Sequence, residues 1–381
     1  MTSRVALVRC SSYEEELVRT AVARGLSLLG GMQSFIRPGE KIVLKPNVLV
    51  GEAPEKLVGP HPFVFKAVAA LAQEVTANLA YGDSPAAGRQ SASLRRAGFA
   101  QVAQALSIPE ADFEHGREVQ FKDSPFLKRF TIANGVLDAD GLISISKLKT
   151  HGLTRITGAI KNQFGCIPGM LKAQHHLGQP NVLDFARMLV CLNLYLRPRL
   201  YVMDGITAMQ GNGPRGGTAR QMNVLLFSAD PVALDATVCR MIDLDPLFVP
   251  TMQPAQEWGL GTYRAEEIEI VGDALASFVQ KDFDVVRAPV RPVTSSTAVS
   301  LGRNLTSPRP VIDAALCKNC GTCVQHCPAS PKAVDWQAGG KSRPPTYSYE
   351  RCIRCYCCQE LCPEGAITVS RPLLGRLLRM S

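Results

Sequence analysis

The chain has 381 residues, of which 46% are hydrophobic and 20% are charged, and its formal net charge is +9. This composition is typical of a folded globular protein that is too long for one ordinary domain. No apolar run approaches the ~20 residues that a membrane-spanning helix needs, so we expect no transmembrane segment. The basic residues are dispersed and aromatic residues make up only 6%, which argues against a nucleic-acid partner.

Short apolar runs alternate with longer helical stretches over residues 1–285. Seven of these runs predict strands, at 5–8, 41–44, 79–81, 142–145, 200–203, 224–227 and 268–271. Apolar strands separated by helices predict an α/β fold, in which a mostly parallel sheet is covered by helices on both faces.

Polar side chains follow five of the predicted strands. They are Lys45 and Asn47, then Asp83, then Lys147 and Lys149, then Asp204, and finally Asp230. Because ligands bind at the edge formed by the carboxyl ends of parallel strands, we expect these side chains to converge there. Plainer explanations stay open for the aspartates: Asp230 before Pro231 is a helix N-cap, and the other two stand beside glycines in turn-forming pairs. A buried Lys45 is harder to explain, because burial of a lysine is costly unless the charge meets an anion.

The densest group of reactive side chains lies between residues 147 and 176, where no acidic residue occurs. Its basic and polar members include Lys147, Lys149, His151, Arg155, Lys161, Asn162, Cys166, Lys172, His175 and His176. Such a segment suits an anionic ligand, for example a phosphate, a carboxylate or a nucleotide tail. The alternative is that these basic residues form a solvated surface and pair with acidic residues elsewhere in the chain.

From these features we expect an anionic small molecule to bind the α/β domain. The predicted substrate-binding residues are Lys45, Asn47, Asp83, Lys147, Lys149, Asn162, Lys172 and Asp204. The predicted catalytic residues are His151, Lys161 and Cys166. His151 is the expected proton donor or acceptor, whereas a buried, inert thiol is the alternative for Cys166. The glycine-rich stretch 211–217 matches no nucleotide-binding fingerprint and is a candidate for a loop that closes over the ligand.

Several motifs resemble those of the bacterial and archaeal family known as domain of unknown function 362. They are Lys45-Pro46-Asn47, Gly82-Asp83-Ser84, Lys147-x-Lys149-Thr150-His151, Lys161-Asn162-x-Phe164-Gly165-x-x-Pro168-Gly169, Asp204-Gly205 and Asp230-Pro231-x-x-x-Asp235. The resemblance spans about residues 1–285 and implies an architecture rather than an activity. Members of the family often carry a carboxy-terminal two-cluster ferredoxin module.

The carboxy-terminal part of the chain repeats one cysteine spacing. The two runs are Cys317-x2-Cys320-x2-Cys323-x3-Cys327 and Cys352-x2-Cys355-x2-Cys358-x3-Cys362, each followed by proline. This spacing holds two cubane iron–sulfur clusters in bacterial ferredoxins, and the fourth cysteine of each run binds the cluster of the other run. We therefore predict two 4Fe–4S clusters. The first cluster is assigned to Cys317, Cys320, Cys323 and Cys362, and the second cluster to Cys352, Cys355, Cys358 and Cys327.

The cysteine runs resemble the bacterial two-cluster ferredoxin module over about residues 311–370, which implies a small α+β domain. A zinc or disulfide staple is the alternative. The additional thiol of Cys357 is expected to be a packed spectator. Residues 286–310 are the predicted linker, 311–372 the predicted cluster domain and 373–381 a basic apolar tail.

Location and partners follow from the cluster chemistry and the charge. Cluster thiolates must stay reduced and the amino terminus lacks a secretory signal, so we expect a cytoplasmic protein. A basic cluster module suits an acidic electron carrier, such as a ferredoxin or flavodoxin, or a redox enzyme. We interpret the chain as an iron–sulfur oxidoreductase whose clusters relay electrons to or from an anionic small molecule at the sheet's carboxyl edge. There are two alternatives. The chain could be a non-enzymatic electron-transfer or adaptor subunit, or it could be a protein that matures iron–sulfur clusters or donates sulfur.

Overall fold

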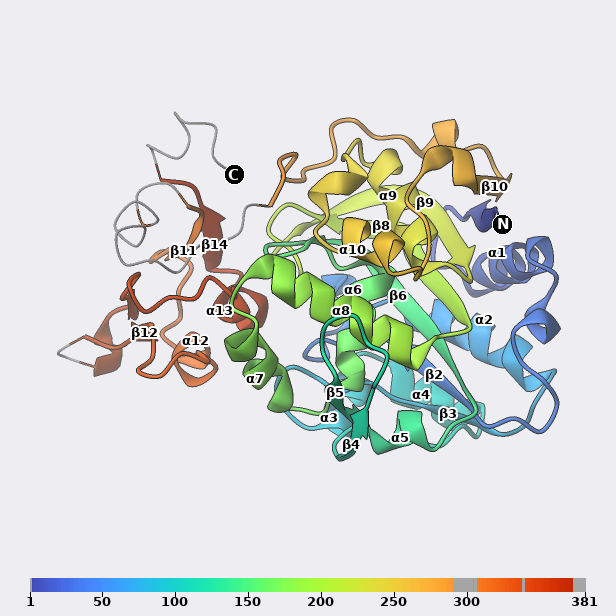
Figure 1. The fold of residues 1–381 in the computed structure, drawn as a ribbon, viewed down its shortest axis with the longest axis horizontal. Helices are drawn as coiled ribbons and strands as arrows, with labels where there is room; N and C mark the ends of the chain where they lie inside the picture. The colour runs from blue at the N-terminus through green and yellow to red at the C-terminus, as the bar shows by residue number, and fades with distance from the viewer. Residues whose placement is uncertain (1, 291–303, 305–306, 338–339, 373–381) are drawn as a thin grey trace.

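The structure is a computed structural model that describes residues 2–290, 304, 307–337 and 340–372. Most of the predicted linker and the whole predicted tail, 373–381, lie outside the described residues. Figure 1 shows a large α/β part and a smaller part, coloured orange to red, that packs against it. Within the described residues no helix combines the length and the apolar character that crossing a membrane requires.

The predicted α/β fold with a mostly parallel sheet is confirmed. The main path of the sheet runs β10 (Ile268–Gly272), β1 (Ser3–Arg9), β9 (Thr218–Ser228), β8 (Leu200–Gln210), β6 (Gly141–His151), β2 (Ile42–Pro46) and β3 (Leu79–Tyr81). The short strand β7 (Arg155–Ile156) pairs with the end of β6, and a separate hairpin joins β4 (Gly116–Gln120) to β5 (Arg129–Ala133). Neighbouring strands of the main path are parallel except at β9, which runs antiparallel to both β1 and β8.

The direction of β9 corrects one prediction about the strand ends. β8 and β9 form a hairpin, so the residues after β9 lie at the opposite edge of the sheet from those after β8. Asp230 is therefore not part of the predicted ligand edge. Its carboxylate accepts hydrogen bonds from the backbone N–H groups of Val232 and Ala233 and so caps α9 (Pro231–Met241), as the plainer explanation held.

Helices cover both faces of the sheet, because side chains alternate between the faces along each strand. One face packs on α1 (Glu15–Leu28), α2 (Pro62–Gln73), α3 (Gln90–Arg96) and α4 (Phe99–Ala105). The other packs on α6 (Gly158–Asn162), α8 (Val182–Leu196), α9 and α10 (Met252–Glu257). Along β8, Leu200 and Val202 belong to the first of these cores and Tyr201 and Met203 to the second. The short helices α5 (Asn134–Leu137) and α7 (Leu171–Gly178) complete this part.

The carboxy-terminal part of the described chain, residues 307–372, forms a cluster module. It contains two antiparallel pairs, β11 (Arg309–Ile312) with β14 (Ile367–Ser370) and β12 (Val334–Asp335) with β13 (Thr346–Tyr347). Two single-turn helices, α12 (Thr322–Gln325) and α13 (Cys357–Leu361), each lie within one cysteine run. This is the predicted small α+β arrangement.

The cluster module docks on the glycine-rich stretch between β8 and β9. The Gln359 side chain donates to Asn212 Oδ1 and to the Gly213 carbonyl, each at 2.8 Å, and Asn212 Nδ2 donates to the Ile367 carbonyl at 3.0 Å. A Cβ atom on Gly216 would lie only 2.9 Å from the Gly365 Cα atom, so glycine is required for this approach. The stretch that we expected to close over a ligand thus mainly holds the cluster module in place.

Candidate functional site between the sheet and the cluster module

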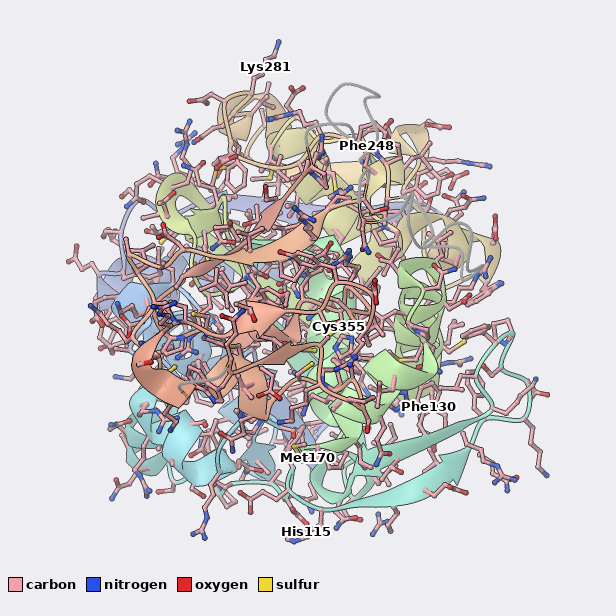
Figure 2. The ribbon with its side chains drawn as sticks, turned by 90° about the vertical axis from the view of Figure 1, so that its left-hand side faces the viewer. His115, Phe130, Met170, Phe248, Lys281 and Cys355 are labelled. Carbon is pink, nitrogen blue, oxygen red and sulfur yellow. The ribbon has the colours of Figure 1, made fainter. Side chains whose placement is uncertain are left out.

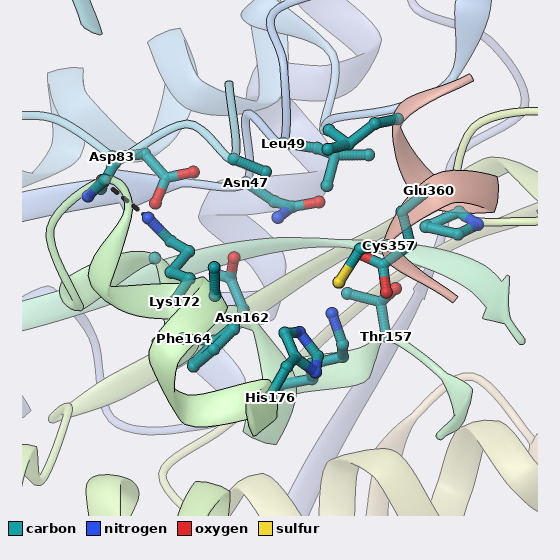
Figure 3. A pocket seen from close by; sticks show the side chains of 18 of the residues that line it. Asn47, Leu49, Asp83, Thr157, Asn162, Phe164, Lys172, His176, Cys357 and Glu360 are labelled. Atoms are coloured by element: carbon teal, nitrogen blue, oxygen red, sulfur yellow. Dashed lines mark hydrogen bonds between the residues drawn. The ribbon is translucent and has the colours of Figure 1, made fainter. Parts of the chain in front are cut away.

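A pocket lies where the cluster module covers the carboxyl edge of the sheet. Its empty volume is about 820 Å³, part of which is open to solvent. The wall from the α/β part includes Asn47, Leu49, Asp83, Ser84, Lys149, Thr157, Lys161, Asn162, Phe164, Met170, Lys172, His176 and Pro214. The cluster module contributes His326, Cys357, Glu360 and Leu361. Figure 3 shows Asp83 and Lys172 at one end and Cys357, Glu360 and Thr157 at the other.

A buried ion pair supports the first end of the pocket. Lys45 is fully buried, and its ammonium lies 2.8 Å from Asp83 Oδ1. The same ammonium donates to the Asn162 carbonyl at 2.6 Å, and Asp83 Oδ2 accepts from the Val48 N–H at 2.8 Å. The anion that a buried Lys45 requires is therefore supplied by the protein itself, and this pair ties β2 to the loop after β3.

Replacement of Lys45 by methionine is expected to destabilise the fold by ~3–5 kcal/mol, because it leaves the Asp83 carboxylate buried without a countercharge. The denaturant midpoint of unfolding measures this effect. A matched control is Lys66→Met, which removes a partly exposed pair with Glu15 and should cost less than ~1 kcal/mol. Equal shifts of the denaturant midpoint in the two variants would contradict a structural role for the buried pair. The same conclusion would follow if adding Asp83→Asn to Lys45→Met failed to recover part of the lost stability.

Three lysines give the pocket a positive lining. Lys172 donates from its ammonium to Ser84 Oγ at 2.7 Å, and Lys149 donates to the Val58 carbonyl. Burial, together with the charge of Lys161, lowers the pKa of Lys149 to about 7. Burial likewise lowers the pKa of Lys172 to about 7, against the raising effect of Asp83. Both ammonium groups are therefore poorly compensated, and an anion in the pocket would stabilise them.

His151 does not line the pocket, and its proton is already engaged. Its Nδ1 atom accepts hydrogen bonds from the backbone N–H groups of Leu153 and Thr154, so the proton of the neutral ring is on Nε2. This Nε2 atom lies 2.9 Å from Glu360 Oε1. Burial lowers the pKa of His151 to about 4, which keeps the ring neutral near pH 7. His151 thus holds a carboxylate of the cluster module at the edge of the pocket.

Glu360 is the acidic member of this lining from the cluster module. Burial by itself would raise its pKa, but Lys161 and His151 hold the pKa below its ordinary value. Glu360 is therefore ionised at neutral pH, and its charge links the module to the lysine-rich edge of the sheet.

Two other predicted substrate-binding residues form a separate cluster. The Lys147 ammonium lies 2.8 Å from Asp204 Oδ2 and 2.8 Å from the Tyr13 hydroxyl. Asp204 also accepts from the backbone N–H groups of His61 and Ile206. Neither Lys147 nor Asp204 lines the pocket, and their polar groups satisfy one another.

The predicted catalytic thiol of Cys166 lies in an apolar core with Val43, Phe113 and Leu142. It is fully buried and does not line the pocket, and burial raises its pKa to about 12. The structure therefore brings Asn47, Asp83, Lys149, Lys161, Asn162 and Lys172 together around the pocket. It places Lys45 beneath them and His151, Cys166, Lys147 and Asp204 elsewhere.

Four polar atoms of the lining have no hydrogen-bond partner among the described residues. Asp83 Oδ1 and Glu360 Oε1 lie in ion pairs, whereas Asn47 Oδ1 and Thr157 Oγ1 have neither kind of contact. Asn47 and Thr157 are only 9% and 3% exposed. Buried polar atoms are nearly always paired in proteins. These two unpaired atoms therefore mark positions at which a bound molecule or water would be held.

The arrangement of the cysteines fits the predicted clusters. Cys317, Cys320, Cys323 and Cys362 line one hollow of the cluster module, although Cys362 belongs to the second run. In the other set, Cys352 packs beside Cys327, and the pKa of Cys358 is raised by burial and then by the charges of Cys355 and Cys352. No three His, Cys, Asp or Glu side chains of the described ranges close around a single metal ion; a cubane holds its four thiolates further apart than one ion does.

Several lining residues escaped the sequence analysis. Cys357, which we expected to be a packed spectator, is partly exposed and faces the pocket. The sequence around Glu360, Leu361 and His326 does not indicate that these residues contact another domain. The unusual pair of adjacent cysteines at 357 and 358 was the one available hint.

Comparison with known proteins places the chain in a family. The sequence model described as "Domain of unknown function (DUF362)" matches residues 42–240, which is more than half of the chain. The chain belongs to this family. A second model, described as a 4Fe-4S dicluster domain, matches residues 309–363 of this DUF362 protein, and it supports the binding of iron–sulfur clusters by the cysteine runs.

A curated relative and a solved structure are also similar to the DUF362 protein. The thylakoid-associated protein sll1697 of Synechocystis sp. is 37% identical over 267 residues, which covers 70% of this chain and 83% of that protein. The lactate racemase apoprotein of Thermoanaerobacterium thermosaccharolyticum is 12% identical, with a TM-score of 0.41 over 63% of this chain. The chain spans just over half of that racemase, 56%.

Proposed function

We propose that this DUF362 protein is an iron–sulfur oxidoreductase whose pocket binds an anionic small molecule. The observation that carries the proposal is the composition of the pocket wall. Lysines of the α/β part form one side, and helix α13, which lies between ligands of both predicted clusters, forms another. When bound, the clusters would supply single electrons.

The residues have different parts in this proposal. Lys149, Lys161 and Lys172 bind the anion, and Asn47 and Asn162 donate or accept hydrogen bonds from the same wall. Asp83 and Lys45 fix that wall through their ion pair. His151 acts as a positioning residue for Glu360, whereas Lys147, Asp204 and Cys166 have structural roles. The proposed units are an α/β domain, 1–285, a linker, 286–310, a cluster domain, 311–372, and a tail, 373–381.

Loss of the Lys172 ammonium is expected to weaken binding of an anion by roughly 10- to 150-fold, because a charge-assisted hydrogen bond contributes ~1.5–3 kcal/mol. Phenyl phosphate is a suitable probe, with affinity measured by calorimetry on the anaerobic holoprotein at pH 6.5. The control is Lys281→Met, since Lys281 projects into solvent far from Cys355 of the cluster module (Figure 2). Equal affinities of Lys172→Met and wild type would exclude this pocket as the anion site.

The redox part of the proposal needs a separate test. Reduced, anaerobic protein should recover its cluster absorbance when the correct small anion is added, and a screen of metabolite carboxylates and phosphate esters would find it. The Lys172→Met variant should lose this recovery and the Lys281→Met variant should keep it. An acidic ferredoxin or flavodoxin is the proposed electron carrier, and we propose a cytoplasmic location.

The thylakoid association of the relative favours a second candidate. In this second candidate function, the chain is an electron-transfer adaptor that docks on a membrane complex, and no substrate enters the pocket. Co-sedimentation with membranes that bear such a complex, together with no response to any anion in the screen, would support the adaptor. The unpaired polar atoms and buried lysines of the pocket favour the oxidoreductase.

A further inference from the structure

The thiol of Cys357 stands between the predicted second cluster and the pocket. Its neighbours Cys355 and Cys358 are assigned to that cluster, while its own side chain lines the pocket. Figure 3 shows the sulfur atom directed toward the middle of the pocket. All 13 cysteines are among the described residues; Cys10, Cys166, Cys191 and Cys239 are buried, and eight are assigned to clusters. Cys357 is therefore the thiol that remains; it is partly exposed, and its side chain shares a hydrogen bond with that of Cys355.

The unpaired polar atoms of the pocket provide a second, independent sign of a ligand at this place. Thr157 lies at the same end of the pocket as Cys357 in Figure 3, and Asn47 lies between this end and Lys172. The oxygen atoms Thr157 Oγ1 and Asn47 Oδ1 are buried without a partner among the described residues. A molecule that reached both oxygens from Lys172 would extend toward the thiol.

The two predicted clusters differ in their position relative to the pocket. His326, next to Cys327 of the second cluster, lines the pocket together with Cys357. The four cysteines assigned to the first cluster line a different hollow together with Lys318, and Lys318 and Cys320 are exposed. Cys357 and His326 stand beside ligands assigned to the second cluster, and Leu361 stands beside Cys362, a ligand assigned to the first. A molecule that contacts Cys357 would therefore approach the second cluster.

We propose that the molecule in this pocket is a two-ended anion that binds Lys172 with its charged group and contacts Cys357 with its redox-active end, so that it exchanges electrons with the second cluster. This inference rests on the proposed function and adds the orientation of the substrate to it. The apolar lining by Leu49, Phe164 and Met170 between the polar groups indicates the chemical class. It is a small carboxylate or phosphate ester with an apolar body.

The electron balance is that of a two-electron couple. The oxidised molecule A needs two electrons and two protons to become AH2. When bound, the two clusters would supply one electron each and would be restored by two one-electron transfers from the acidic carrier, and the protons would come from solvent. The reverse reaction would deliver the same two electrons to the carrier and the two protons to solvent.

Alkylation of Cys357 tests the proposed contact without any turnover. Anaerobic holoprotein is treated with iodoacetamide in the presence of phenyl phosphate or inorganic phosphate, and the modified peptide is quantified by mass spectrometry. Phenyl phosphate at ten times its Kd should slow the labelling of Cys357 about tenfold, by simple occupancy. Inorganic phosphate bound at Lys172 does not extend to the thiol and should leave the rate unchanged. The Lys172→Met variant should lose the protection, and Cys357→Ser should lose the label.

The outcomes separate this inference from the proposed function. Failure of both probes to bind would count against the anion site itself. Binding of phenyl phosphate that depends on Lys172 but leaves the rate of Cys357 labelling unchanged would overturn only the contact with the thiol. A second readout is the EPR spectrum of variants that retain one cluster. Phenyl phosphate should change the spectrum of Cys320→Ser, which keeps the second cluster, and not that of Cys327→Ser; the opposite result would place the first cluster at the pocket.

Discussion

Replacement of Cys362 by serine is expected to remove the first cluster, although Cys362 belongs to the second cysteine run. The reason is that the Cys362 sulfur lies in the hollow lined by Cys317, Cys320 and Cys323, as the spacing of such runs requires. The iron content of anaerobically isolated protein should fall from about eight to about four per chain. Iron analysis and EPR of the dithionite-reduced protein measure this directly.

Double variants give this prediction its sharpest form. Cys320→Ser combined with Cys362→Ser should still hold about four irons, because both side chains serve one cluster. Cys320→Ser combined with Cys355→Ser should hold almost none, because each change removes a different cluster. The control is Cys357→Ser, which replaces a neighbouring thiol that we assign to neither cluster and should retain about eight irons. Loss of all iron from the Cys320/Cys362 pair would show that each run binds its own cluster.

The parts of the fold that were predictable depend on local signals. Buried parallel strands are short apolar runs, and their ends are marked where polar residues begin. This signal located Asn47 and Asp83 after β2 and β3, and the pocket contains both residues. The cysteine spacing is also local, because three thiols at fixed intervals wrap one face of a cluster.

The parts that were missed depend on contacts between distant segments. The sequence of β9 does not reveal its direction, which follows from its hairpin with β8. Lys147 and Lys149 are alike in sequence, but a register shift between β6 and β8 falls between them, and only Lys149 reaches the pocket. Glu360 and Cys357 enter the site because the cluster module docks on the glycine-rich stretch, through partners such as Asn212 and Gln359.

Binding of an anion to the pocket is expected to weaken steeply as the pH rises through neutrality. The cause is the two buried lysines, Lys149 and Lys172, whose pKa values burial lowers to about 7. Each ammonium is protonated below its pKa and neutral above it. An anion prefers the protonated pair, so affinity is greatest below pH 7 and falls above it.

The size of the effect follows from linkage. If binding requires both lysines to be charged, the Kd of phenyl phosphate should increase about a hundredfold between pH 6 and pH 8, with a slope approaching two protons at higher pH. Calorimetry in buffers of different ionisation enthalpy measures the Kd and the proton uptake together. The opposite sign, tighter binding at pH 8, would mean that the anion does not meet these ammonium groups.

A conservative variant identifies the lysines as the cause. Lys172→Arg keeps a positive charge at all pH values in the experiment, so its Kd should depend on one proton rather than two and should increase only about tenfold over the same interval. Lys172→Met should show the same reduced slope with weaker binding throughout. Lys281→Met, altered far from the pocket, should keep the full dependence of the wild type. An unchanged slope in Lys172→Arg would mean that groups other than Lys172 titrate, and Lys172 would then lose its assigned role.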